Sequence, residues 1–229
     1  MTAFFSKGSS KAGFTRAGLI AAFAGAALMA AAPAAHAARN TEAEQYVQTN
    51  ATAALTSLTN RQSPEARQQA FGQLMGRFAD VPRIANFVLG RYAVQLRSDA
   101  ALRTEWIATF QAYSNAVYED QLDRYRGNAI RVTGSVERVA GRDVIVRTEI
   151  TPRGAQRPLP VQWRILRSGA AWKVVDVSLV LDGNEIWLAQ QQQRDFLAQL
   201  DRSRGDIRAL IRSVRETTAQ MRARINARG

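Results

Sequence analysis

The chain has 229 residues, no cysteine, a single histidine and a formal net charge of +12. The lack of cysteine excludes disulfide bonds, so the fold must rest on its hydrophobic core. The length suffices for one domain with a substantial core.

The first 37 residues have the three-part plan of a secretory signal peptide. Three basic residues precede an uncharged apolar run over residues 17–32, and a small-x-small triplet, Ala35-His36-Ala37, follows. This run is shorter than the ~20 residues that a membrane-spanning helix needs. We therefore expect cleavage after Ala37 and a mature domain of residues 38–229 in the periplasm. An uncleaved membrane anchor is the alternative.

Loss of this segment changes the chemistry that is available. It removes the only histidine, His36, and leaves 28 basic against 19 acidic residues, a net charge of +9. Without imidazole and thiol groups, Ser-His-Asp and Cys-His nucleophiles and the usual zinc sites are excluded. We expect no metal, no cofactor and no nucleic acid. The anionic partners of such an exported protein are lipid headgroups or acidic protein surfaces, unless the arginine excess only reflects the host's codon composition.

Four helices are predicted before any strand, each with a capping residue or an apolar stripe. They span residues 41–58, 63–78, 82–89 and 98–125. The longest has a wide and aromatic apolar face made of two adjoining stripes. The first stripe contains Leu102, Trp106, Phe110, Tyr113 and Val117, and the second contains Ile107, Tyr118, Leu122 and Tyr125.

After these helices, the spacing of apolar residues changes from a helical period to the alternation of strands, in segments rich in Val, Ile and Trp. Four strands are predicted over residues 130–139, 143–152, 159–167 and 172–181, and their short connectors imply an antiparallel meander. Alternation places Val144, Val146, Thr148 and Ile150 on one face of their strand, and Val161, Trp163 and Ile165 on one face of the next. The fourth strand is apolar on both sides, which is typical of a central or doubly covered strand.

Two helices, over residues 185–200 and 206–226, complete the pattern, and the last has an arginine-rich face. That face could touch an anionic membrane or an acidic partner, or simply be solvated. The order of elements predicts a single α+β domain, in which a curved four-stranded antiparallel meander is wrapped by about six helices. Such a cone can enclose an apolar pocket.

Several segments between Asp80 and Leu200 resemble the MlaC family, which is also called the toluene-tolerance family. The matching segments, in order, are Phe87-Val88-Leu89-Gly90-Arg91-Tyr92, residues 106–125, Val146-Arg147-Thr148-Glu149-Ile150, Trp172-Lys173-Val174-Val175-Asp176-Val177 and Gln193-Arg194-Asp195-Phe196. The resemblance implies an NTF2-like sheet with a helical subdomain around a deep apolar pocket.

The resemblance also implies a function. Members are periplasmic phospholipid carriers that serve as auxiliary components of an ABC transporter and support outer-membrane lipid asymmetry. They pass lipid between an inner-membrane transporter complex and an outer-membrane lipoprotein complex. One branch is associated with hopanoids. The sequence from Val180 to the four glutamines that follow Ala189 departs from the family pattern. Both a phospholipid and a hopanoid-like lipid therefore remain candidate ligands.

We expect the lipid to be bound by apolar and aromatic side chains of the third and fourth helices, the segment between them and the sheet. These are Phe87, Val88, Tyr92, Trp106, Phe110, Tyr113, Val117, Val146, Thr148, Val161, Trp163 and Ile165. Packing of the same residues as an ordinary core is the alternative. Arg147 and Arg164 are candidates for a headgroup contact at the rim, or for ion pairs that stabilise the sheet.

Two other functions compete with a carrier. The same fold hosts enzymes that use a lone Asp or Tyr in an apolar pocket, and Asp176 with Tyr113 or Tyr118 could form such a pair. No residue spacing demands this pair, so we do not predict an enzyme. A protein-binding envelope adaptor is the third possibility, and it would have a solid interior.

Overall fold

The computed structural model describes residues 39–59, 63–122, 125, 129–151, 158–181 and 183–228. The predicted signal peptide lies outside the described residues. So do residues 123 and 124 of the longest predicted helix. The described residues all belong to one compact unit.

The sheet is a five-stranded antiparallel meander in which neighbours in sequence are neighbours in space. Val146 pairs with Trp163 and Thr148 pairs with Val161, so the predicted inner faces of the two strands coincide. The fourth strand is hydrogen-bonded on both sides, as its apolar sequence predicts. The strands are β1 (Ile130–Val139), β2 (Asp143–Ile150), β3 (Leu159–Ser168), β4 (Ala171–Leu181) and β5 (Asn184–Trp187).

The fifth strand corrects the prediction of four strands and of a helix that begins at residue 185. Gly183 adopts a φ of +80°, which closes a tight turn that favours glycine. Ile186 then pairs with Leu179. The Ser178 hydroxyl donates to a Glu185 carboxylate oxygen at 2.7 Å, which ties the short strand to its neighbour. The helix begins only after this hairpin.

Six α-helices and one 3₁₀ helix accompany the sheet among the described residues. The Asn40 side chain accepts a hydrogen bond from the Ala43 N–H, and the Asp99 carboxylate accepts one from the Leu102 N–H, which are typical helix caps. The 3₁₀ helix was not predicted. The helices are α1 (Thr41–Ser57), α2 (Pro64–Phe78), α3 (Val81–Val88), η1 (Gly90–Arg97), α4 (Ala100–Leu122), α5 (Leu188–Arg202) and α6 (Ile207–Ala227).

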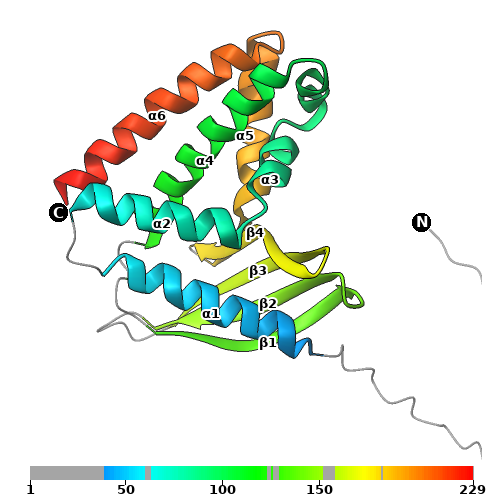
Figure 1. The fold of residues 1–229 in the computed structure, drawn as a ribbon, viewed down its shortest axis with the longest axis vertical. Coiled ribbons are helices and arrows are strands. Elements are labelled where there is room, and N and C mark those ends of the chain that lie inside the picture. The colour runs from blue at the N-terminus through cyan, green and yellow to red at the C-terminus, as the bar shows by residue number, and fades with distance from the viewer. Residues whose placement is uncertain are drawn as a thin grey trace, which may run out of the picture. The chain divides into compact units, whose positions relative to one another are not determined.

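These elements form two regions, as Figure 1 shows. The sheet lies at one end with α1 across it, and α4, α5 and α6 rise away from the sheet to form a helical subdomain. α4 contributes to both regions, since its last turns reach the sheet end. No helix among the described residues is long and apolar enough to cross a membrane.

The helical subdomain has a solid aromatic core. The Phe196 ring lies 5.7 Å from the Trp106 ring and 6.5 Å from that of Phe110, both nearly edge-on. The Trp106 indole N–H donates to the Ala85 carbonyl oxygen at 2.8 Å, so the buried polar group is satisfied.

The arginine face of α6 pairs mainly with acidic side chains of α4 and of its N-terminal cap. Arg208 contacts Asp99 and Glu105 at 3.2 Å each. Arg222 binds the buried Glu119, and Arg228 binds Asp120. These contacts give the basic face a structural role in holding the two helices together.

Candidate functional site

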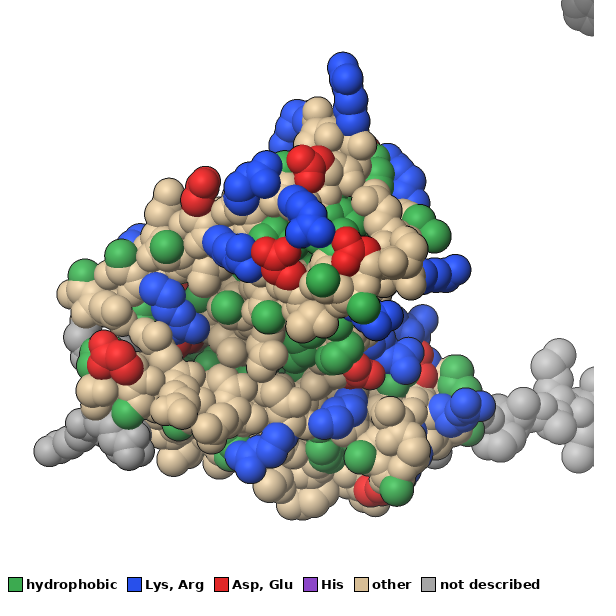
Figure 2. Space-filling model, turned by 45° about the horizontal axis from the view of Figure 1, so that its top comes forward, with side chains coloured by type: hydrophobic (Ala, Val, Ile, Leu, Met, Phe, Trp, Pro, Cys, Tyr) green, Lys and Arg blue, Asp and Glu red, His purple; other side chains and the backbone are tan. Residues whose placement is uncertain are grey.

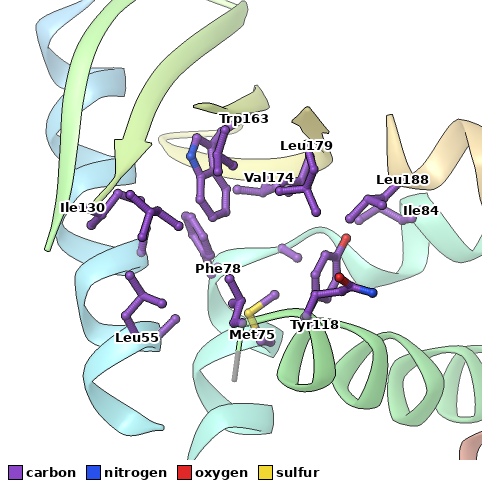
Figure 3. Close-up of a pocket in the computed structure, with 18 residues that line it drawn as sticks. Leu55, Met75, Phe78, Ile84, Tyr118, Ile130, Trp163, Val174, Leu179 and Leu188 are labelled. Atoms are coloured by element: carbon purple, nitrogen blue, oxygen red, sulfur yellow. The ribbon is translucent and has the colours of Figure 1, made fainter. Parts of the chain in front are cut away.

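An apolar cavity lies between the inner face of the sheet and the helices (Figure 3). Every helix and strand from α1 to α5 except η1 and β5 contributes to its walls. Two alanines and Leu55 line it on α1, and larger side chains line it on the sheet. The lining residues are Ala51, Ala54, Leu55, Met75, Phe78, Ala79, Ile84, Tyr118, Gln121, Leu122, Ile130, Ile150, Val161, Trp163, Val174, Val177, Leu179 and Leu188.

The cavity is narrow. The empty space between its walls amounts to about 660 Å³, part of it open to solvent. The void within it that is wide enough for a water molecule measures only about 40 Å³. A dry cavity that holds a benzene molecule measures about 150 Å³. An acyl chain can therefore enter this cavity only if its walls move apart.

Hydrogen bonds fix the orientation of the large aromatic side chain on the cavity floor. The Trp163 indole N–H donates to the Thr148 hydroxyl at 2.9 Å, and this hydroxyl donates to the Val161 carbonyl at 3.1 Å. The Trp163 ring lies 5.5 Å from Phe78, which lies 5.5 Å from Tyr46. The polar edge of the indole is thus occupied, and its apolar surface is left to the cavity.

Two further side chains bring polar groups to the cavity wall, Tyr118 and Gln121 on α4. Burial raises the pKa of Tyr118 well above its usual value, with a smaller contribution from the nearby Asp176 carboxylate. The Tyr118 hydroxyl therefore stays protonated at any physiological pH.

Asp176 performs a structural task beside the cavity. Its Oδ1 atom accepts hydrogen bonds from the backbone N–H groups of Val177 and Ala189, both at 2.8 Å, and thereby holds the start of α5. Burial raises the pKa of this carboxyl, while these backbone donors and Arg164 act in the opposite direction. The described residues contain no group of acidic side chains that could hold a metal ion.

A broad groove with three arginines lies beside the cavity, and the two share Ile84. Arg83, Arg164 and Arg194 reach it from α3, β3 and α5, and Phe87 adds an aromatic ring that is 43% exposed. Figure 2 shows basic side chains around a notch between the helices and the sheet. We call these four residues and their surroundings the basic groove.

The structure brings two of the predicted lipid-binding residues, Val161 and Trp163, to the cavity wall. Val146 and Ile165 are buried in the same sheet face, and Thr148 orients Trp163. A role in lipid binding stays a prediction for all of them.

The remaining predicted residues lie elsewhere. Trp106, Phe110 and Tyr113 surround Phe196, and Tyr113 also borders a separate groove over α5 and α6. Val88 is buried in α3 and Val117 is half-buried in α4. Phe87 lies in the basic groove, and the Tyr92 hydroxyl donates to Asp201 at 2.7 Å.

The two rim candidates also lie apart from the cavity. Arg164 contacts Asp143 through two nitrogens, at 3.2 and 2.9 Å, in an ion pair of the kind that stabilises a sheet. Arg147 is exposed on β2, opposite the buried face.

Sequence reasoning missed most of the cavity wall. Tyr118 and Leu122 belong to the second apolar stripe of the long helix, and it is this stripe that faces the cavity. Ala51 and Ala54 on α1 are one turn apart, and a row of small residues opposite a sheet was a signal that space is left there.

Comparisons with known proteins agree with this architecture. A family model described as MlaC protein matches residues 45–216. One solved structure with the same fold is the phospholipid-binding protein from Ralstonia solanacearum in complex with a phospholipid, with a TM-score of 0.66 and 21% identity over 78% of this chain and 98% of that chain. A search of curated proteins found no match. Because the family model spans most of its length, this chain belongs to the MlaC family.

Proposed function

We propose that the protein is a lipid carrier that encloses acyl chains in the cavity between its sheet and its helices. The apolar walls of that cavity are the observation that carries the proposal. The family supports it, and so does the Ralstonia protein of the same fold, which is described as phospholipid-binding and in complex with a phospholipid.

Enclosure is what the physical chemistry of a lipid requires. Each buried methylene contributes ~0.8 kcal/mol, so two chains of about fifteen methylenes represent on the order of 24 kcal/mol. A surface patch cannot offset this loss when a lipid leaves a bilayer, because half of each chain would stay in water. A cavity closed on all sides can.

The narrowness of the cavity indicates that lipid entry moves its walls. No continuous strand ladder joins α1 or α2 to the sheet. Gln48 of α1 bonds the backbone of Ile130 and Val132 on β1, and the end of α2 has a single bridge, from Ala79 to Val174 on β4. Small residues such as Ala51 and Ala54 leave the α1 backbone close to the cavity. Bound acyl chains would supply the apolar contacts that the closed walls now give each other, so the lipid would favour a widened state.

We further propose that the carrier works in the periplasm, between an inner-membrane lipid ABC transporter complex and an outer-membrane lipoprotein complex. The signal-peptide pattern and the family support this location. The basic groove supports docking on acidic partner surfaces. Exchange of Arg83 and Arg194 for Glu should leave bound lipid unchanged and slow its delivery to vesicles made from the host's envelope. Unchanged delivery would exclude the groove as the docking surface.

The position of Asp176 favours a carrier over an enzyme. A general base needs a free carboxylate oxygen directed at its substrate. Oδ1 of Asp176 is occupied by the backbone N–H groups of Val177 and Ala189, Gln190 adds a third backbone donor to the carboxyl, and the side chain is buried. A cavity with almost no polar lining likewise favours a carrier over an adaptor with a solid interior.

Lipid extraction tests the proposal directly. Residues 38–229 are purified after export, extracted with organic solvent and analysed by mass spectrometry. We expect a stoichiometric acyl lipid, and the spectrum distinguishes a phospholipid from a hopanoid-like lipid. A protein that is empty after export, and that takes up no phospholipid from vesicles, would contradict the proposal.

Two substitutions locate the lipid. Val161→Glu places a charge in the cavity wall, where the native side chain is 2% exposed, and should abolish lipid copurification. Val139→Glu is the matched control on β1, where the side chain is 53% exposed, and should retain lipid. If Val161→Glu does not fold, Ala54→Leu narrows the same cavity without a charge, with the more exposed Ala53→Leu as its control. Full lipid content in both cavity variants would show that lipid binds elsewhere.

A further inference from the structure

The second half of α1 and most of α2 line the cavity but form few hydrogen bonds to other elements. We call these segments, residues 49–59 and 63–76, the flap. Figure 1 shows α1 and α2 side by side, with the end of α1 and the start of α2 at the same edge of the molecule. The flap residues that line the cavity are Ala51, Ala54, Leu55 and Met75.

The hydrogen bonds that anchor both helices lie outside the flap, at its other end. Gln48 of α1 donates to the Ile130 carbonyl on β1 at 2.9 Å. The Tyr46 hydroxyl donates to the Phe78 carbonyl at 2.9 Å and so ties the start of α1 to the end of α2. The Asp80 N–H, just after α2, donates to a β4 carbonyl at 2.9 Å. These anchors form a fixed end about which the flap can swing.

The flap itself is held loosely. Among the described residues, its only hydrogen bond to another element runs from Gln68 to α6 at 2.9 Å and is exposed. Toward α4 the flap presents two glycines. A Cβ atom at Gly72 would lie 2.9 Å from the Asn115 amide, and one at Gly76 would lie 3.4 Å from that of Gln111. No α2 side chain therefore interlocks with α4 at these two positions.

A buried cation opposes closure of the flap. Arg67 lies on the α2 face that carries Phe71 and Met75, one and two turns before them, and is only 6% exposed. Its Nη2 atom is buried without a hydrogen-bond partner, and no ion pair joins Arg67 to a described acidic residue. Burial of an unpaired charge is costly, and this cost disappears when the guanidinium reaches water. Arg67 therefore makes the closed flap less stable than its apolar contacts alone would.

We propose that the flap swings away from α4 to admit acyl chains, and that the unpaired Arg67 keeps the closed flap easy to open. This inference rests on the proposed carrier function and identifies which wall of the cavity moves. Met75 of the flap and Tyr118 of α4 both line the cavity (Figure 3), so the movement parts the wall between them. The apolar contacts that the flap loses are those that acyl chains can replace.

A reversible cross-link tests the flap. The sequence has no cysteine, so Gly72→Cys with Asn115→Cys introduces the only two thiols. The Asn115 Cγ atom lies 3.9 Å from a Cβ atom at Gly72, which is close enough for a disulfide. Delipidated mature protein is mixed with phosphatidylcholine vesicles that contain phosphatidylglycerol with a fluorescent chain. We expect the disulfide to stop lipid uptake and reduction to restore it.

Arg131→Cys with Glu149→Cys is the matched control. These residues pair across β1 and β2, and their native side chains are in contact at 2.8 Å, so a disulfide there staples the sheet without touching the flap. Oxidation should leave lipid uptake unchanged in this control. Equal uptake by the oxidised and reduced forms of the protein with Gly72→Cys and Asn115→Cys would show that lipid enters elsewhere, and the carrier function would stand.

Arg67→Met tests the role of the buried cation, since it keeps the length of the side chain and removes the charge. The delipidated variant should unfold at a higher temperature than wild type. It should also take up lipid roughly tenfold more slowly, because an unsatisfied buried charged group no longer opposes closure. Arg77→Met, at an exposed position of the same helix, is the control and should change neither property.

The outcomes separate this inference from the function on which it rests. An Arg67→Met protein that is less stable than wild type, or that takes up lipid as fast, would overturn the role of Arg67 in opening. If wild-type protein takes up no lipid from the vesicles, the proposed carrier function itself fails.

Discussion

The two ends of α4 have similar apolar sequences and very different surroundings. In the first half, Trp106 and Phe110 are buried against Phe196 of α5. Tyr118 lies about 18 Å beyond Trp106 along the helix axis, at 1.5 Å per residue, and lines the cavity. The difference comes from what lies opposite. An aromatic ring fills the space at one end, and Ala51 and Ala54 leave it open at the other.

Truncation of one aromatic side chain in each half should give the clearest contrast. Phe110→Ala removes contacts on all sides and should lower the free energy of unfolding by about 3–5 kcal/mol. Tyr118→Ala should cost only ~1–2 kcal/mol, because one side of that ring already faces empty space. Urea denaturation followed by circular dichroism measures both. Equal losses would show that the cavity end is packed as tightly as the helical core.

Loss of the buried ion pair between Glu119, next to Tyr118, and Arg222 should lower the free energy of unfolding almost as much. The Glu119 side chain is 2% exposed and binds Arg222 of α6. Glu119→Ala leaves this guanidinium partly buried without its partner and should cost about 3–5 kcal/mol. Asp120→Ala is the neighbouring control, since the Asp120 and Arg228 side chains are 24% and 46% exposed. That control should cost ~1 kcal/mol or less in the same denaturation experiment. A small effect at both positions would contradict the importance of burial at this interface.

Asp176 links the two regions, since it holds the start of the helix that carries Leu188 to the cavity and Phe196 to the solid core. Asp176→Ala leaves the N–H groups of Val177 and Ala189 without their acceptor and should cost ~1–2 kcal/mol. Asp176→Asn keeps an acceptor oxygen and should be much milder. Thermal unfolding at neutral pH distinguishes the two.

The same carboxyl gives stability a pH dependence of known sign. Burial raises its folded-state pKa above the usual 3.8, so in this window the folded state binds more protons than the unfolded state. Its contribution to stability therefore falls as pH rises from 3.8 through the raised pKa. Compared with Asp176→Asn, wild type should lose stability across that window. A difference between the two proteins that does not change with pH would contradict the raised pKa.

Most of the fold could be predicted from the sequence because its elements are strongly periodic. β1 begins and ends where alternation places it, and α2 follows its Ser63-Pro64 start. β5 was missed because four residues are too few for a period to appear, and the contacts that define it come from β4. η1 has no distinctive pattern, and its hydrogen bonds go to residues far away in sequence, from Tyr92 to Asp201 and from Gln95 to Gly205.

The cavity could be predicted as a type of site but not residue by residue. Trp106 and Trp163 are both buried aromatic residues on regular elements, and periodicity predicts burial for each. Only the volume of the side chains opposite determines that Trp163 borders a space and Trp106 does not. That volume is set by α1 and α5, which are far away in sequence. Asp176 likewise looked like a candidate base until its backbone partners were located.

The smallest effect is expected where α6 pairs with exposed groups at the solid end of α4. Arg208 contacts Asp99 and Glu105 at 3.2 Å, but more than half of its side chain is exposed. Water and salt screen such pairs, so Arg208→Gln should change the free energy of unfolding by less than ~1 kcal/mol, and 1 M salt should remove the difference. A larger loss that survives in salt would mean that this end of the interface depends on specific ion pairs as much as the buried Glu119 end does. The aromatic packing of Trp106 and Phe110 would then not be what keeps this half of α4 in place.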